Sequence, residues 1–180
     1  MAITYPLSFP DWLRGMTKSD FDIPMQVEVA PIGGGDIARD LGPSLWKADY
    51  RTVLLGYDEV ERFRMWIKLL RNGVESFWGY NFRRPYTESY PNGFAGLTRA
   101  GGGAFTGAIT ITTINSDNKT MTLGGFPAGF VINPGDGIAF DYSSTIRAYH
   151  QFAEPATATS LGAVDAVEVV PHVRPGWTEG

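Results

Sequence analysis

The sequence predicts a mainly β protein with one packed α-helix, and three observations support this fold class. The chain of 180 residues contains 22 Gly and 12 Pro, a composition typical of short strands joined by tight turns. Apolar and polar residues alternate in several short segments, as in half-buried strands. The apolar spacing that indicates a helix occurs convincingly in one segment, about residues 59–71.

The composition excludes several classes of site. The chain is 43% hydrophobic and 13% aromatic, so it can bury a core. It has no cysteine, which excludes disulfides, thiolate metal sites and cysteine nucleophiles. No stretch approaches the ~20 apolar residues of a membrane span. The N-terminus lacks the basic region and long apolar run of a secretory signal.

The charge is unevenly distributed along the chain. Residues 101–180 carry seven acidic and three basic side chains, which accounts for the net charge of −4. A nucleic-acid-binding domain usually carries a clustered basic excess, so we expect no stable nucleic-acid binding. The shift near residue 100 supports a boundary between two domains, 1–96 with the helix and 97–180. Several short strands at regular spacing predict a small antiparallel barrel or sandwich for 97–180, followed by a C-terminal extension.

The first 24 residues have no regular pattern and are predicted to form an extended arm. Prolines at 6, 10 and 24 push the residues before them into extended geometry. Large apolar anchors, Phe9 and Trp12 first among them, either pack on the same domain or lie across a neighbouring subunit. Beyond the arm, alternation predicts short strands at 26–29 and 46–53.

The helix carries its own start and stop signals. Asp58 is the expected N-cap, with Glu61 three residues later as in a capping box. Asn72-Gly73 supplies the stop. We expect one face to be buried on the sheet, formed by Val60, Phe63, Ile67 and Leu70 and joined by Trp66 and Leu69.

Basic residues gather on the other side of the helix and after the next segment. Arg64, Lys68 and Arg71 share one helical face, and Arg83 and Arg84 follow the aromatic segment 76–82. A solvated face is the simpler interpretation. The alternative is a docking edge, which makes these residues, with Phe9 and Trp12, the candidate subunit interface.

The rest of the chain is predicted to form strands and turns. The aromatic density of 76–82 predicts a strand covered on both faces. Turn residues at 115–118 and 133–137 predict two hairpins. Further strands are expected at 109–114, 120–123, 137–140, 145–152 and 164–170.

No catalytic, cofactor-binding or metal-binding motif is present. His150 and His172 belong to no metal-ligand pattern, and no nucleophile elbow or phosphate loop occurs. The pairs Glu59–Glu61 and Asp136–Asp141 have the residue types of glycosidase carboxylates, but a structural role is the simpler interpretation. We therefore expect a protein that is not an enzyme and needs no cofactor.

Several segments resemble the distal tail proteins of long-tailed, siphovirus-like bacteriophages. They are the opening Met-Ala-Ile-Thr-Tyr-Pro-Leu-Ser, Trp46-x-Ala48-x-Tyr50, Leu69–Gly73, Phe77–Tyr80, Gly124–Pro127, Pro134–Asp136 and Val169–Pro175. The resemblance covers most of the chain and rests on structural signatures. Relatives in that family continue into a closing strand after the Arg-Pro-Gly segment. In this chain, either the sheet does not close or a partner supplies the closing strand.

The resemblance implies a virion structural protein at the tail tip, assembled in the host cytoplasm. Such proteins form a ring, commonly a hexamer, that joins the tail tube protein to the tail hub and receptor-binding apparatus, with tail fibres as further partners. The resemblance implies a ring-forming β-sandwich or barrel with the packed helix for 1–96, and a small β-barrel of the oligonucleotide/oligosaccharide-binding type for 97–180. DNA passes through such a ring without being held. Alternatives are a tail tube or tube-terminator protein, a carbohydrate-binding β module using Tyr142 or Tyr149, and a small carboxylate hydrolase.

Overall fold

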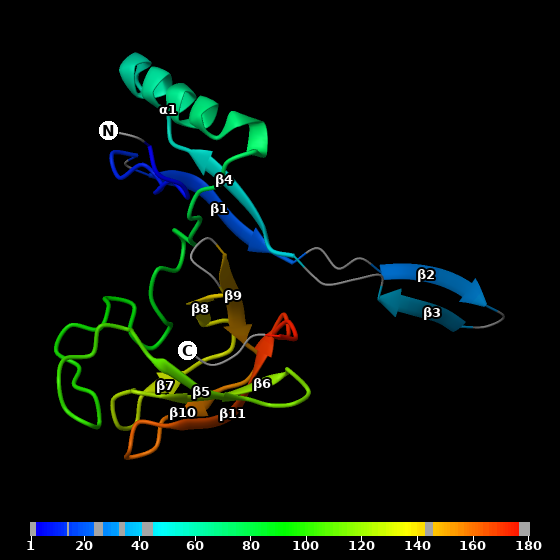
Figure 1. Ribbon diagram of the computed structural model, residues 1–180, viewed down its shortest axis with the longest axis vertical. Coiled ribbons are helices and arrows are strands. Elements are labelled where there is room, and N and C mark those ends of the chain that lie inside the picture. The colour runs from blue at the N-terminus through cyan, green and yellow to red at the C-terminus, as the bar shows by residue number, and fades with distance from the viewer. Residues whose placement is uncertain are drawn as a thin grey trace. The chain divides into compact units, whose positions relative to one another are not determined.

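The computed structural model describes residues 3–13, 15–23, 27–32, 35–40, 45–142 and 146–176. Within these ranges the fold is mainly β with a single α-helix, which confirms the predicted fold class at that level (Figure 1). The chain separates into two compact units, Met1–Arg83 (unit 1) and Arg84–Gly180 (unit 2).

The division between the units falls before the loop 85–96, whereas the sequence places it between residues 96 and 97. The reason is aromatic packing. Tyr90 stacks on the buried Phe130 with ring centroids 4.4 Å apart, and Phe94 contacts Phe105 at 5.1 Å. The loop therefore belongs to the core of unit 2, although its composition alone indicates a connection.

Two separate antiparallel strand pairs form the sheets of unit 1. Strand β1 (Met16–Asp22) pairs with β4 (Lys47–Thr52), and β2 (Val27–Ile32) pairs with β3 (Gly35–Asp40). The prediction of an irregular arm was wrong for β1. Its polar sequence, MTKSDFD, has only Thr17 and Phe21 among the residue types typical of strands, and its pairing depends on a partner far along the chain.

Helix α1 (Tyr57–Leu69) begins two residues earlier than predicted. Gly56 is the N-cap, and its N–H donates to the Glu59 carboxylate at 2.9 Å, so Asp58 and Glu61 were the wrong capping pair. The C-terminal stop is confirmed. Asn72 and Gly73 have φ of 57° and 92°, in the left-handed region that ends a helix.

The inner face of α1 is only partly covered. Trp66 packs on Phe77 with ring centroids 5.0 Å apart, and its indole N–H donates to the Ser8 carbonyl at 3.3 Å. No residue of α1 is fully buried, and Ile67 is 45% exposed. The predicted buried face is thus only half-buried, and the prediction was wrong for Ile67, whose truncation removes little buried surface.

Phe9 is the centre of unit 1. Its buried ring lies 4.8–6.1 Å from five other aromatic rings, those of Tyr50, Trp66, Phe77, Tyr80 and Phe82. The predicted strand over 76–82 was wrong, since its strand pairing is a single bridge between Leu7 and Phe77. The aromatic residues of this segment lie close together in the sequence because their rings surround Phe9. Periodicity in the sequence cannot reveal such packing.

Unit 2 is built on a five-stranded antiparallel sheet with the order β5-β6-β11-β9-β8. Its strands are β5 (Thr110–Ile114), β6 (Thr120–Gly124), β8 (Gly137–Asp141), β9 (Arg147–Phe152) and β11 (Val164–Val170), with β7 (Val131–Ile132) paired to β10 (Ala156–Thr157). Residue 145, which starts one predicted strand, lies outside the described residues. Among those described, β5 and β8 remain separate edges, and the sheet does not close into a barrel.

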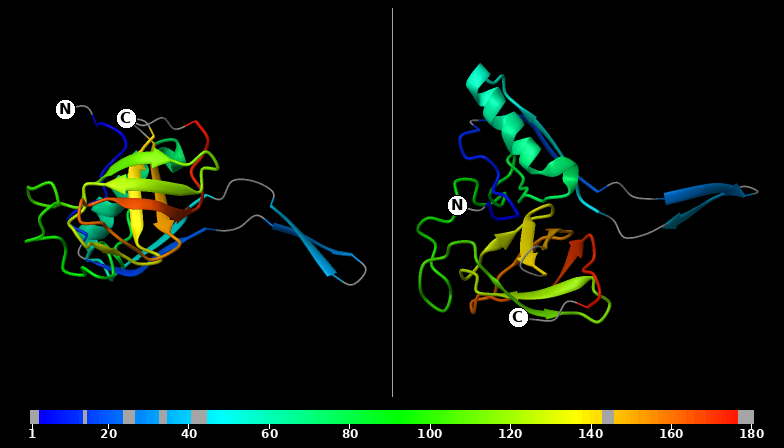
Figure 2. Two further views of the ribbon diagram at one scale, coloured as in Figure 1. Left: turned by 90° about the horizontal axis from the view of Figure 1, so that it is seen from below. Right: turned by 45° about the horizontal axis from the view of Figure 1, so that its top comes forward.

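The sheet bends where β11 changes partner. A register shift between Val164 and Val167 marks a bulge, and β11 pairs with β6 before it pairs with β9. Bulges bend a strand and increase its twist. Figure 2 shows the result, since the yellow strands β8 and β9 run across the direction of the green strands β5 and β6.

One of the two predicted hairpins in unit 2 is confirmed. The turn 115–118 joins β5 to β6, with the Asn118 N–H donating to the Asn115 carbonyl at 2.8 Å. The segment 133–137 is a turn, but the hairpin prediction was wrong because β7 and β8 do not pair with each other. The short strands β7 and β10 had no sequence signal long enough to predict.

The core of unit 2 gives a direct stability test. Leu123 on β6 is fully buried, whereas Leu161 is 86% exposed. We expect Leu123→Ala to lower the unfolding free energy by about 2–5 kcal/mol, because it leaves a cavity. Leu161→Ala is the matched control and should change it by less than about 0.5 kcal/mol. Urea unfolding followed by circular dichroism measures both, and equal effects would contradict this core.

Candidate assembly interface

The strand pair β1–β4 is incompletely covered. Among the described residues each of the two strands pairs only with the other, so each keeps one edge without a strand beside it. An isolated two-stranded sheet is marginal in water, and an unpaired edge is a template for pairing with another chain. This geometry makes β1–β4 the first candidate for contact with a partner.

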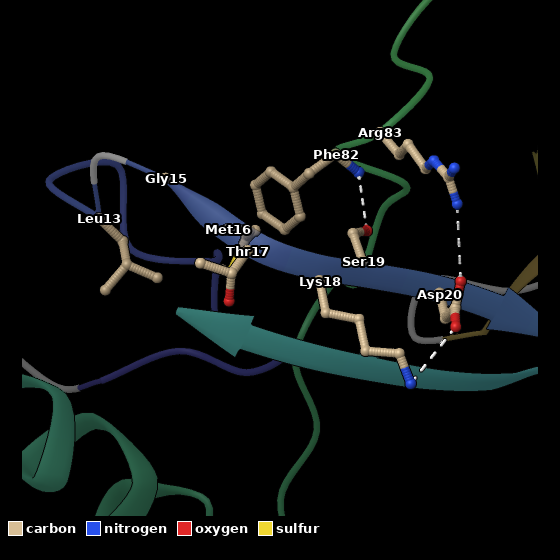
Figure 3. A pocket seen from close by; sticks show the side chains of 9 residues that line it. All are labelled: Leu13, Gly15, Met16, Thr17, Lys18, Ser19, Asp20, Phe82 and Arg83. Carbon is tan, nitrogen blue, oxygen red and sulfur yellow. Dashed lines mark hydrogen bonds and ion pairs between the residues drawn. The ribbon is translucent and has the colours of Figure 1, made fainter. Parts of the chain in front are cut away.

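A groove runs along β1, with residues 82–83 on its other side (Figure 3). It has a volume of about 630 Å³ and is lined by Leu13, Gly15, Met16, Thr17, Lys18, Ser19, Asp20, Phe82 and Arg83. The Phe82 N–H donates to the Ser19 hydroxyl at 3.2 Å, which holds one point of the groove together. The lining mixes apolar and charged groups, which suits a peptide chain better than a small apolar ligand.

The sheet has one aromatic face and one charged face. The register sets Ser19 opposite Tyr50, on the face that meets the Phe9 cluster. The alternate positions carry three basic and three acidic residues, which are Lys18, Lys47, Arg51, Asp20, Asp22 and Asp49. This face is therefore balanced in charge.

Lys18 organises the charged face. Its ammonium lies 2.7 Å from Asp49 and 3.3 Å from Asp20, two carboxylates directly opposite each other in the ladder. Like charges in that position repel, and Lys18 neutralises them. Its hydrogen bond lowers the pKa of Asp49, and the same contact raises the pKa of Lys18.

Large apolar side chains are also exposed in unit 1. Leu54 and Tyr57, between β4 and α1, are 100% and 95% exposed, and Val74 after the helix is 76% exposed. Met65 on the helix is 55% exposed. Apolar groups concentrated on one element and its ends mark interaction sites more often than single scattered residues do.

The predicted interface residues have different environments. Phe9 is buried inside unit 1, so its ring is not presented to another subunit, and Trp12 is half-buried. Arg64, Lys68 and Arg71 are all exposed on α1 or just after it. Arg64 contacts Glu61 at 2.9 Å, and Arg71 contacts Glu75 at 3.4 Å.

The neighbours Arg83 and Arg84 serve different units. Arg83 is exposed, and its guanidinium lies 3.9 Å from Asp20 at the β1 groove. Arg84 donates to the buried Asp136 at 2.8 Å and to Glu88 at 3.1 Å in unit 2.

Sequence reasoning missed the groove residues of β1, because their alternation is polar on one side and mixed on the other.

Asp136 is a structural carboxylate. Its side chain has no exposed surface and accepts from the Arg84 guanidinium and from the N–H groups of Glu88 and Asn133, at 2.8–2.9 Å. It joins the first residues of unit 2 to the turn before β8. This accounts for Asp136 without catalytic chemistry.

His150 is the second buried polar side chain of unit 2. It stacks on Phe140, and its Nδ1 contacts the Pro171 carbonyl. A carbonyl only accepts, so Nδ1 carries the proton. Nε2 is buried without a hydrogen-bond partner among the described residues. Burial lowers the pKa of His150, and the charge of Arg174 acts in the same direction.

Comparison with known proteins found no matching family model, curated protein or solved structure. Among the described residues, no group of three His, Cys, Asp or Glu side chains is placed to hold a metal ion. No helix in the described ranges is long and apolar enough to cross a membrane. The resemblance to distal tail proteins therefore stays a prediction from the sequence.

Removing the Asp136 carboxylate should destabilise unit 2. We expect Asp136→Ala to lower its unfolding free energy by about 3 kcal/mol or more, since Arg84 and two N–H groups lose a buried acceptor. Glu88→Ala removes only the exposed partner of Arg84 and should cost less than about 1 kcal/mol. Urea unfolding measures the difference, and similar losses would refute the role of Asp136.

His150 predicts a pH-dependent stability of unit 2. Because its pKa is lowered on folding, the unfolded chain binds more protons, and stability falls as pH drops below about 6.5. His150→Phe keeps a ring beside Phe140 and should flatten the slope between pH 7 and 5. Thermal unfolding across that range tests this, and an unchanged slope in His150→Phe would count against it.

Proposed function

We propose that this chain is a virion structural protein of a long-tailed bacteriophage, a distal tail protein that forms a ring at the tail tip. The observation that carries the proposal is the open strand pair β1–β4, with an edge groove and exposed apolar residues in the same unit. In this proposal, other copies cover most of the exposed strand edges and apolar side chains of unit 1. The sequence resemblance indicates that those copies meet in a ring at the tail tip.

The open edges support a head-to-tail contact. The edge of β1 on one copy and the edge of β4 on the next are different surfaces, so pairing them gives a heterologous interface, which closes into a ring when the rotation fits. Adding strands in this way extends the two-stranded sheet into a continuous one. The ring-forming β-sandwich of the family is thus proposed to be completed by neighbours.

The balanced charge of β1–β4 suits a ring through which DNA passes. A lining of clustered Lys and Arg would bind phosphates and release counterions, which retains DNA. The alternate face of β1–β4 carries equal numbers of acidic and basic residues, and Lys18 is paired with Asp20 and Asp49. Such a surface has no net attraction for phosphate.

The other partners follow from the resemblance. A distal tail ring joins the tail tube protein on one side to the hub and receptor-binding apparatus on the other, and tail fibres attach to it. Unit 2 is proposed as a compact scaffold of barrel-like type for those contacts. We propose no enzymatic activity.

A tail tube or tube-terminator protein is the nearest rival, since open strand edges serve those assemblies equally. The carbohydrate-binding alternative finds less support. The hydroxyl of Tyr142 accepts the Arg174 N–H at 3.0 Å, and burial raises the pKa of the Tyr149 hydroxyl. Both tyrosines are thus engaged in the fold of unit 2.

The oligomeric mass tests the proposal. Six copies of 19.7 kDa give about 118 kDa for a closed six-fold ring. We expect light scattering of the purified protein to give that mass, and negative-stain images of the same fraction to show rings.

A matched pair of variants separates specific assembly from adhesion. Leu45→Asp places a charge on an exposed apolar residue just before β4 and should reduce ring formation, whereas Leu161→Asp in unit 2 should not. A monomer at all concentrations, or equal loss in both variants, would overturn assembly through β1–β4.

A further inference from the structure

The outward face of α1 presents an ordered series of exposed groups. Positions 57, 61, 64, 65 and 68 share one side of the helix, and each is exposed. The acidic residues of the helix precede its basic ones, and Met65 lies between the basic residues Arg64 and Lys68. The helix has 13 residues and is about 20 Å long, enough for a helix–helix contact.

The series is complementary to itself when reversed. Glu61 lies as far before the midpoint between Arg64 and Met65 as Lys68 lies after it. An antiparallel second copy therefore places its basic end against the acidic end of the first. A parallel copy would place acid on acid and base on base.

The exposed apolar groups follow the same symmetry. Leu54 and Tyr57 flank the start of α1, and Val74 follows its end. In the antiparallel arrangement, the start of one copy meets the end of the other, so these groups come together. Arg64 and Met65 flank the axis, so each comes close to its own counterpart in the second copy. The two Arg64 guanidinium groups would repel, and the Glu61 carboxylate 2.9 Å from each Arg64 offsets that repulsion.

We propose that α1 pairs antiparallel with α1 of a second copy, about a two-fold axis beside Met65. The carboxylate of Glu61 already accepts from Arg64 of its own helix at 2.9 Å. A carboxylate has about four lone-pair sites, so it can also accept from Lys68 of the second copy. An acidic start and a basic end also interact favourably with the dipole of the same helix. The charge exchange described below separates this effect within one helix from pairing between two copies.

This contact goes beyond the proposed ring. A two-fold contact is isologous, whereas the ring contact is heterologous, so the two use different symmetry and different surfaces. The helix contact joins copies in pairs.

The absence of cysteine allows a direct test by disulfide cross-linking. We expect Met65→Cys in the otherwise unchanged full chain to form a disulfide dimer under mild oxidation, because the axis brings this residue against itself. Leu161→Cys, exposed in unit 2, is the control for random collision and should remain largely uncross-linked.

Charge exchange tests the pairing of the ends. Glu61→Lys in the Met65→Cys background should lower the cross-linking rate by about tenfold through like-charge repulsion. The double change Glu61→Lys with Lys68→Glu should restore it, since the exchanged charges again match across the axis. Circular dichroism confirms that each variant keeps its helix.

The outcomes distinguish this contact from the ring. Rings without Met65→Cys cross-linking overturn the helix contact and leave the ring intact. Cross-linked dimers that form no larger species support the helix contact and overturn the ring. Cross-linking equal to that of Leu161→Cys, or no rescue by the double change, overturns the antiparallel pairing.

Discussion

The ring of Phe9 holds unit 1 together, and the other features of that unit depend on it. A two-stranded sheet and one helix of 13 residues cannot bury an apolar face by themselves. Phe9 supplies the missing layer, with five aromatic rings around it from β4, α1 and the segment 76–82. Backbone bonds fix its position, since the Leu7 N–H donates to the Ser76 carbonyl and the Trp78 N–H to the Leu7 carbonyl, both at 2.9 Å. Burial raises the pKa of Tyr50 to about 12, so its hydroxyl stays protonated and donates to the Tyr80 carbonyl.

The two units differ in how completely they bury their apolar side chains and pair their strands. Unit 2 has five paired strands and a core in which Met121, Leu123 and Val169 have no exposed surface. Its one fully buried carboxylate, Asp136, is satisfied by three donors among the described residues. Among the described residues, unit 1 leaves the outer edges of both its strand pairs without a neighbouring strand, and several of its large apolar side chains are exposed. Unit 2 therefore carries its own stability, and unit 1 has the surface that association would cover.

The charges of unit 1 are arranged in two distinct ways. On β1–β4 the basic and acidic residues are equal in number, and Lys18 is paired with Asp20 and Asp49. On α1 they are segregated, acidic at the start and basic at the end, which gives a direction to the surface. A balanced face passes a polyanion without holding it, and a segregated one recognises a partner in one orientation. Both surfaces lie outside the Phe9 cluster and are therefore open to these roles.

The sequence by itself determined the elements that local periodicity and turn chemistry encode. Strand β11, the turn 115–118 and the stop at Asn72-Gly73 follow from alternation and left-handed turn residues, and the fold class follows from them. It also supplied Arg64, Lys68 and Arg71 as exposed candidates, because helical spacing places them on one side. Only the tertiary structure decided that β1 is a strand, that the aromatic segment 76–82 surrounds Phe9, and that the adjacent Arg83 and Arg84 serve different units. Each of these depends on residues tens of positions apart, and such contacts leave no period in the sequence.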